Sequence, residues 1–123
     1  MTLLIIGVGG FLGAVVRYLT YTWARVQFST QLPAATLMIN VAGCFFAGML
    51  MVFVERGVPY HRHLLLLGLT GFLASYTTFS TFGLETVDLI RSNDIGLALI
   101  NVTANLLGGL IAVIAGRALA GLA

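Results

Sequence analysis

The stretch that decides the fold of this chain is residues 68–82, Gly68-Leu69-Thr70-Gly71-Phe72-Leu73-Ala74-Ser75-Tyr76-Thr77-Thr78-Phe79-Ser80-Thr81-Phe82. It lies inside an uncharged run from Leu64 to Leu84 that is long enough to cross a bilayer. Its centre is nevertheless dense in hydroxyls and aromatic rings. A simple membrane anchor carries Leu, Ile or Val there, because hydroxyls gain nothing from facing lipid tails. This polar band must therefore face protein, water or an ion, and it is our candidate for the functional part of the molecule.

The composition indicates a membrane protein with one domain. Of the 123 residues, 59% are hydrophobic and only 8% are charged, whereas soluble domains carry about 25% charged residues. Six scattered arginines, no lysine and four acidic residues give a net charge of +2, which is too little for a nucleic-acid surface. The single Cys44 excludes an intrachain disulfide and a cysteine metal cluster. We therefore expect residues 1–123 to form a single transmembrane domain with no nucleic-acid partner.

Hydropathy predicts an all-α membrane protein with four transmembrane helices. Three runs of bilayer-spanning length contain no Asp, Glu, Lys or Arg, and a first run of similar length carries Arg17 in its second half. The first run has no basic n-region and no convincing cleavage site, so we expect it to be retained as a helix rather than removed as a signal peptide. The predicted helices cover about residues 2–23, 34–54, 64–89 and 95–119.

The arginines predict no preferred orientation in the membrane. With four spans, both termini and the loop 55–63 lie on the same side. That side carries Arg56, Arg62 and Arg117, and the other carries Arg25 and Arg91, with Arg17 near the end of the first helix. Excess Lys and Arg in short loops sets topology, and here the bias is very small. We therefore hypothesise dual topology, in which oppositely inserted copies pair.

Several polar side chains lie on the otherwise apolar helices. Thr36, Asn40, Gly43 and Ala47 form a narrow stripe at i, i+4, i+7 and i+11, and Asn101 and Asn105 are spaced i, i+4 above a run of small residues. Such amides either hold helices together by hydrogen bonds or line a path for an anion. Arg17 either extends to the membrane surface or provides a cation at the mouth of such a path. Gly9 and Gly13 have the spacing of a close helix contact.

The third helix is expected to break near its middle. Thr77 and Thr78 are β-branched, and Ser and Thr side chains compete with helical backbone hydrogen bonds. A break over Ala74–Thr77 would free carbonyls, which are tolerated in a membrane only when they are buried or coordinate an ion. Phe79 and Phe82 share one face beside the hydroxyls of Ser80 and Thr81, which suits either core packing or a functional lining. Glu85 and Asp88 follow near the membrane surface, and the simplest interpretation of both is a solvated helix end.

The sequence shows no catalytic or metal-binding motif, so we do not expect an enzyme. His61 and His63 lack the cysteines or spaced carboxylates of a zinc site, and no nucleotide-binding, zinc-protease or serine-hydrolase motif is present. No charged residue lies in the central part of the last three helices, whereas proton-coupled transporters generally use a carboxylate there. Hydroxyls, amides and the positive edges of Phe rings remain, and these can replace the water around a small anion. The residues thus favour passive anion permeation.

The chain resembles the Fluc (CrcB-type) fluoride channels over essentially its full length. Three elements carry the resemblance: residues 9–18, GGFLGAVVRY; residues 33–43, PAATLMINVAG; and residues 77–82, TTFSTF, followed by Glu85. The resemblance implies an antiparallel homodimer in the plasma (bacterial inner) membrane. It also implies passive export of fluoride through two pores, each drawing on both subunits.

The resemblance also implies roles for particular residues. The fluoride path would be lined by Asn40, Ser80 and Thr81, with the ring edges of Phe79 and Phe82 facing the ion and Glu85 in the polar track. Arg17 would lie in or near the vestibule. A structural sodium ion at the dimer centre would be held by the carbonyls of Ala74 and Thr77. Asn101 and Asn105 stand where relatives often carry Tyr or Ser, and we include both in the path.

One departure from the family concerns the expected break, and two other functions remain open. Ala74-Ser75 replaces a usual Gly-Gly, which would strain the backbone if either position needed a positive φ.

The alternative functions are a small dual-topology, proton-coupled multidrug transporter and a non-transporting assembly subunit. The former relies on a Glu in the first helix, where this chain carries Arg17 instead. A heterodimer with an oppositely oriented paralogue is an alternative to the homodimer.

Overall fold

The computed structural model describes residues 1–28 and 32–122, and within them the chain is helical with short connections. The elements are α1 (Thr2–Gln27), α2 (Ala34–Glu55), α3 (His61–His63), the π-helical η1 (Leu64–Leu73), α4 (Ala74–Tyr76), α5 (Phe79–Arg91) and α6 (Ile95–Gly121). Four helical stretches in these described residues are long and apolar enough to span a membrane, the third being His61–Arg91. This confirms the predicted all-α fold with four spans. The helices extend one to four residues beyond most of the predicted bounds.

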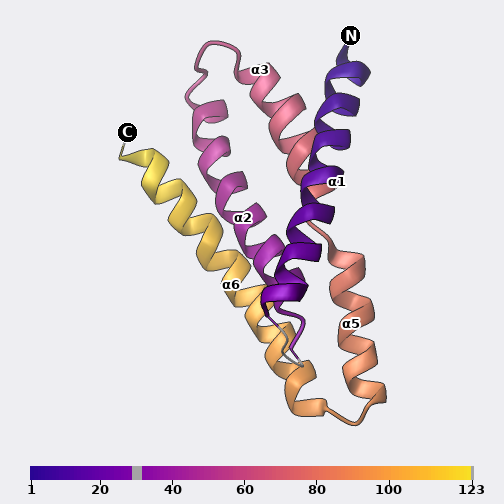
Figure 1. Cartoon of the computed structure of the whole chain (residues 1–123). Coiled ribbons are helices and arrows are strands. Elements are labelled where there is room, and N and C mark those ends of the chain that lie inside the picture. Colours follow the sequence, from indigo (N-terminus) through magenta and orange to yellow (C-terminus); the bar gives the residue numbers. More distant parts are fainter. Residues whose placement is uncertain (29–31, 123) are drawn as a thin grey trace.

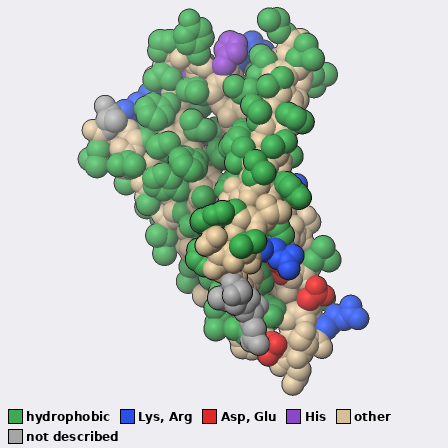
Figure 2. All heavy atoms as spheres, viewed as in Figure 1, with side chains coloured by type: hydrophobic (Ala, Val, Ile, Leu, Met, Phe, Trp, Pro, Cys, Tyr) green, Lys and Arg blue, Asp and Glu red, His purple; other side chains and the backbone are tan. Residues whose placement is uncertain are grey.

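The helices run up and down across the molecule (Figure 1). The N-terminus, the connection from α2 to α3 and the C-terminus lie toward one end, and the connection from α5 to α6 lies at the other. Hydrophobic side chains cover most of the visible surface between the two ends, and charged side chains gather toward the ends (Figure 2). This distribution suits helices whose middle sections face lipid.

Glycines allow the helices to pack closely in two pairs. α2 packs along α6, and α1 packs against η1 and α4. A Cβ atom on Gly13 would overlap the carbonyl oxygen of Phe72, and one on Gly116 would overlap the carbonyl oxygen of Phe45. Neither position therefore accepts a side chain unless the helices separate. The predicted contact role of Gly9 and Gly13 is confirmed, since Gly9 approaches the backbone of η1 equally closely.

The third span is broken, as expected, but the break lies at the C-terminal end of the predicted segment. Thr77 (φ −76°, ψ 157°) and Thr78 (φ −147°, ψ 106°) are extended and separate α4 from α5. Ala74 stays helical at φ −63°, and the described non-glycine residues with positive φ are Tyr60 and Asn93. Ala74-Ser75 therefore carries no strain from a positive φ. The helix continues to Tyr76 because the amide of Thr77 still donates to the carbonyl of Leu73, at 3.0 Å.

The π-helical segment η1 was not predicted. At its end the amide of Ala74 donates to the carbonyl of Leu69, five residues earlier, as well as to that of Gly71. The hydrophobic pattern of the sequence cannot distinguish a π-helix from an α-helix here, because nearly every residue of the segment is apolar and no polar face marks the helical period. π-Helical turns occur frequently near functional sites, and here η1 leads directly into α4 and the break.

Candidate functional site

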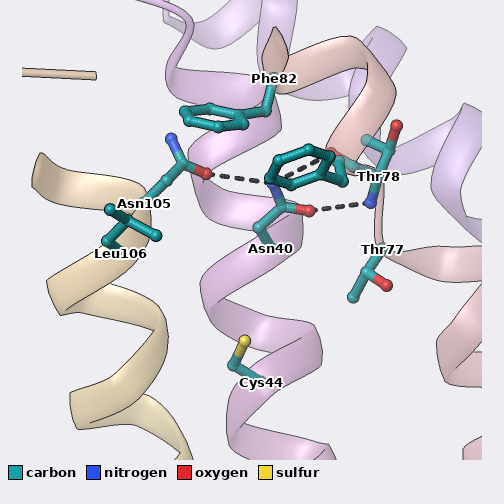
Figure 3. Close-up of a pocket in the computed structure, with 8 residues that line it drawn as sticks. Asn40, Cys44, Thr77, Thr78, Phe82, Asn105 and Leu106 are labelled. Atoms are coloured by element: carbon teal, nitrogen blue, oxygen red, sulfur yellow. Dashed lines mark hydrogen bonds between the residues drawn. The ribbon is translucent and has the colours of Figure 1, made fainter. Parts of the chain in front are cut away.

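The side chain of Asn40, on α2, bridges the break in the third span. Its Oδ1 accepts from the amide of Thr78 at 2.9 Å, and its Nδ2 donates to the carbonyl of Thr78 at 3.2 Å (Figure 3). Both backbone groups of an extended residue are thus satisfied by a single carboxamide from another helix. A residue outside regular structure needs such partners inside a membrane, and Asn40 supplies them.

A chain of hydrogen bonds continues from Asn40 into α6. Nδ2 of Asn40 also donates to Oδ1 of Asn105 at 3.0 Å, and Nδ2 of Asn105 donates to Oδ1 of Asn101 at 3.1 Å. Asn101 is fully buried, and its Nδ2 donates to the hydroxyl of Thr86 at 2.9 Å. The chain ends where that hydroxyl donates to the carbonyl of Phe82 at 2.7 Å. The three asparagines therefore tie α2, α5 and α6 together.

Hydroxyl groups surround the start of α5. Oγ1 of Thr78 accepts from the amide of Thr81 at 3.2 Å, which caps the helix, and donates to the Thr81 hydroxyl at 2.8 Å. The Ser80 hydroxyl lies 3.4 Å from the same oxygen. These contacts explain why α5 begins immediately after the break.

The same contacts redirect two backbone donors. In a continuous helix the amide of Thr78 would donate to the Ala74 carbonyl, and the amide of Thr81 to the Thr77 carbonyl. Here the first donates to Asn40 and the second to the Thr78 hydroxyl. The Ala74 and Thr77 carbonyls have thus lost their usual helical donors and fit the oxygen ligands that a hard cation prefers. Among the described residues, no group of three or more His, Cys, Asp or Glu side chains could hold a metal ion.

Glu85 is half-buried and held by two other helices. Its Oε1 accepts from the hydroxyl of the fully buried Thr36 at 2.9 Å and from that of Tyr21 at 3.3 Å. Its Oε2 is buried with no hydrogen-bond partner among the described residues. Glu85 is therefore part of the polar interior rather than a solvated helix end, whereas Asp88 is exposed.

Two cavities adjoin the break, and Thr78 borders both. The first, of about 230 Å³, is lined by Asn40, Cys44, Thr77, Thr78, Phe79, Phe82, Asn105 and Leu106 (Figure 3). The second, of about 350 Å³, is lined by Ala14, Arg17, Tyr18, Tyr21, Thr78 and Thr81. Apart from Arg17 and the thiol of Cys44, the polar side chains lining the two cavities carry amides and hydroxyls. Such a lining can donate hydrogen bonds to an anion without offering a carboxylate.

Phe79 and Phe82 differ greatly in burial although they pack together. Their ring centroids are 5.5 Å apart with the planes inclined by 51°. Phe82 is 9% exposed, whereas Phe79 is 80% exposed on this chain. The first cavity is therefore bounded on one side by a ring that a neighbouring molecule could cover.

The structure brings most of the predicted site residues together. Asn40, Asn105, Phe79 and Phe82 share the first cavity with Thr77, and Arg17 shares the second with Thr81. Ser80 is exposed beside them, and Asn101 lies behind Asn105 without lining either cavity. Glu85 follows Thr81 by four residues on α5, and Ala74 lies just before the break.

Four polar residues of this region were not among the site residues predicted from the sequence: Thr78, Thr36, Tyr21 and Thr86. Thr36 could have been found, because it precedes Asn40 by one helical turn in the same polar stripe. Thr86 and Tyr21 gave no signal of their own, since a hydroxyl near a helix end is common. Their partners come from other helices.

Comparison with known proteins places the chain in a family. The family model described as "CrcB-like protein, Camphor Resistance (CrcB)" matches residues 4–117. The chain is 41% identical over 103 residues to "Fluoride-specific ion channel FluC" of a Sulfurovum species, which covers 84% of this chain and 80% of that protein. It is 37% identical over 117 residues to the protein of the same name from Clostridium perfringens, covering 95% and 91%. It is also 36% identical over 119 residues to "Fluoride-specific ion channel FluC 3" of Methanosarcina barkeri, covering 97% and 89%. This chain, an integral multi-pass membrane protein, therefore belongs to the CrcB-like protein family.

Proposed function

We propose that the protein is a passive, fluoride-selective ion channel and not an enzyme. The observation that carries the proposal is the pair of cavities bordered by Thr78, whose linings contain hydrogen-bonding groups and Arg17 but no carboxylate, within the membrane-spanning helices. Membership of the CrcB-like family and the names of the relatives support fluoride as the permeating ion. The residues that line the cavities provide donors for an anion and no motif for catalysis.

Fluoride is small and strongly hydrated, so a pore must replace the water that the ion loses. Arg17 attracts the anion into the second cavity by its charge. The hydroxyls of Ser80 and Thr81 and the amide of Asn40 donate hydrogen bonds to it. The edges of Phe79 and Phe82 present the positive part of the ring quadrupole.

The remaining polar residues complete this path. Asn105 borders the first cavity and Asn101 supports it from behind. Glu85 belongs to the polar track through the hydroxyls of Thr36 and Tyr21. No proton-coupled step is required, because the ion moves down its electrochemical gradient out of the cytoplasm.

The working form is an antiparallel homodimer with two pores. Its support is the nearly balanced distribution of arginines between the two ends and the 80% exposure of Phe79 beside the first cavity. A ring that must face an ion needs a second wall, which a partner copy would supply. A sodium ion at the dimer centre would be held by the carbonyls of Ala74 and Thr77, and its charge would stabilise these freed backbone oxygens.

The test is ion efflux from proteoliposomes that contain the purified protein, followed with a fluoride electrode and compared with chloride efflux. Rapid fluoride release with little chloride release is expected. Proton-dependent uptake of a cationic drug would support the multidrug transporter instead. A folded dimer without any ion flux would support the assembly subunit. Crosslinking of the single gene product in membranes distinguishes the homodimer from a heterodimer.

A further inference from the structure

The orientation of the buried amides is determined by backbone carbonyls, which can only accept hydrogen bonds. The Thr86 hydroxyl donates its one hydrogen to the carbonyl of Phe82 at 2.7 Å. Toward Asn101, 2.9 Å away, it can therefore only accept, so Asn101 must present its NH2 group there. The Oδ1 of Asn101 is then left facing Asn105.

Asn105 is oriented in the same way. Its Nδ2 lies 3.0 Å from the carbonyl oxygen of Asn101 and 3.1 Å from Oδ1 of Asn101, both of which are acceptors. The side chain of Asn105 must therefore direct its NH2 group toward Asn101 and its oxygen toward Asn40, 3.0 Å from Nδ2. Asn105 thus presents an acceptor, not a donor, at the wall of the first cavity.

Both hydrogens of the Asn40 NH2 group are consequently in use. One is donated to the Thr78 carbonyl and the other to Oδ1 of Asn105. The bond to Thr78 is reinforced by the reciprocal bond from the Thr78 amide, whereas the bond to Asn105 is single. An anion that binds Asn40 must therefore displace the Asn105 oxygen.

We propose that Oδ1 of Asn105 is a built-in competitor that makes Asn40 selective, and that Asn101 and Thr86 are the positioning residues that hold this oxygen in place. A passing anion obtains the Asn40 hydrogen only when it accepts more strongly than an amide oxygen. Fluoride, with its charge concentrated on a small ion, does so, whereas chloride accepts weakly. This inference rests on the proposed function and adds a selectivity role to it.

The test measures the ratio of fluoride to chloride efflux in proteoliposomes of the full-length protein. Thr86→Val removes the hydroxyl that orients Asn101, and Asn101→Leu removes the link to Asn105. After either change the backbone carbonyl of Asn101 is the one fixed acceptor that still orients Asn105, so the hold on Asn105 weakens and the Asn40 donor becomes free part of the time. Chloride efflux should rise and the ratio should fall about threefold to tenfold, the range that one net hydrogen bond provides. Thr86→Ser keeps the hydroxyl and should keep the wild-type ratio.

Thr22→Val is the matched control. The Thr22 hydroxyl also donates to a carbonyl four residues earlier, that of Tyr18, but it lies exposed on α1 and accepts from no side chain in the described structure. The ratio of fluoride to chloride efflux of the Thr22→Val variant should equal that of the wild type. Asn105→Leu removes the competing oxygen itself and should lower the ratio at least as much as Thr86→Val or Asn101→Leu.

An unchanged ratio in a folded Asn105→Leu channel would overturn the inference while leaving fluoride conduction by the wild type intact. An unchanged ratio in folded Thr86→Val and Asn101→Leu channels would overturn the positioning role of Thr86 and Asn101. A wild-type protein that releases no fluoride would instead overturn the proposed function, and the inference with it.

Discussion

Replacing Asn40 by Leu should destabilise the protein strongly, although the two side chains are similar in size. The substitution removes three hydrogen bonds, two to Thr78 and one to Asn105. Side-chain hydrogen bonds in membrane proteins contribute about 0.6 kcal/mol each on average and up to about 1.7 kcal/mol. The free energy of unfolding should therefore fall by about 2 to 5 kcal/mol. The upper part of this range is favoured because the Thr78 amide and carbonyl lie outside any helix and would be left without partners.

Asn105→Leu provides the comparison. It also removes the bonds between Asn105 and its neighbours, but it leaves Thr78 paired with Asn40. The Asn101 carbonyl that loses Asn105 lies within α6, where its helical hydrogen bond remains. This variant should lose less than half as much unfolding free energy as Asn40→Leu.

Both variants can be measured by reversible unfolding in mixed detergent and SDS, with helix content as the signal. Equal unfolding curves for wild type and Asn40→Leu would refute the conclusion that Asn40 holds the break together. Equal losses in the two variants would show that the bond between the amides matters and that the pairing with Thr78 does not.

Three further predictions concern packing, the aromatic pair and topology. Gly13→Ala should lower the free energy of unfolding of the purified protein by about 1–3 kcal/mol, because the added Cβ meets the carbonyl of Phe72. Gly7→Ala should leave the free energy of unfolding unchanged, because Gly7 has open space around it. Phe79→Leu and Phe82→Leu should each slow fluoride efflux by about tenfold without dissociating the dimer, because a ring edge is lost from the path; flux that survives loss of both rings would remove their assigned role. Reporter enzymes fused to the C-terminus should reveal copies in both orientations, and a single orientation would disprove dual topology.

Much of the fold followed from local patterns. The four spans were predictable because a bilayer-crossing helix needs about 20 apolar residues, and the runs in this chain are separated by short charged segments. The break in the third span was predictable because hydroxyls and β-branched residues cluster there. The sequence pattern predicted the break over Ala74–Thr77, whereas the extended residues in the structure are Thr77 and Thr78. The exact position depends on Asn40, which is distant in sequence and binds the Thr78 amide.

The candidate site was only partly visible in the sequence. The polar stripe on α2 and the spacing of Asn101 and Asn105 indicated amides that need partners, and the Phe pair lay beside them. The partners themselves were not visible, since a hydrogen bond between helices depends on how the helices pack. Glu85 illustrates this most clearly: its partners come from α1 and α2, so its buried position could not be inferred from α5 alone.

Hydropathy and residue type were thus sufficient to establish a four-span membrane protein with a polar, broken third helix, because these properties depend on neighbours along the chain and on the lipid solvent. Only the packed structure decided that Asn40 pairs with Thr78, that Asn101 is buried and bonded to Asn105, and that Thr78 borders two cavities. These features depend on groups that meet across helices far apart in the sequence, at distances set by the close glycine contacts.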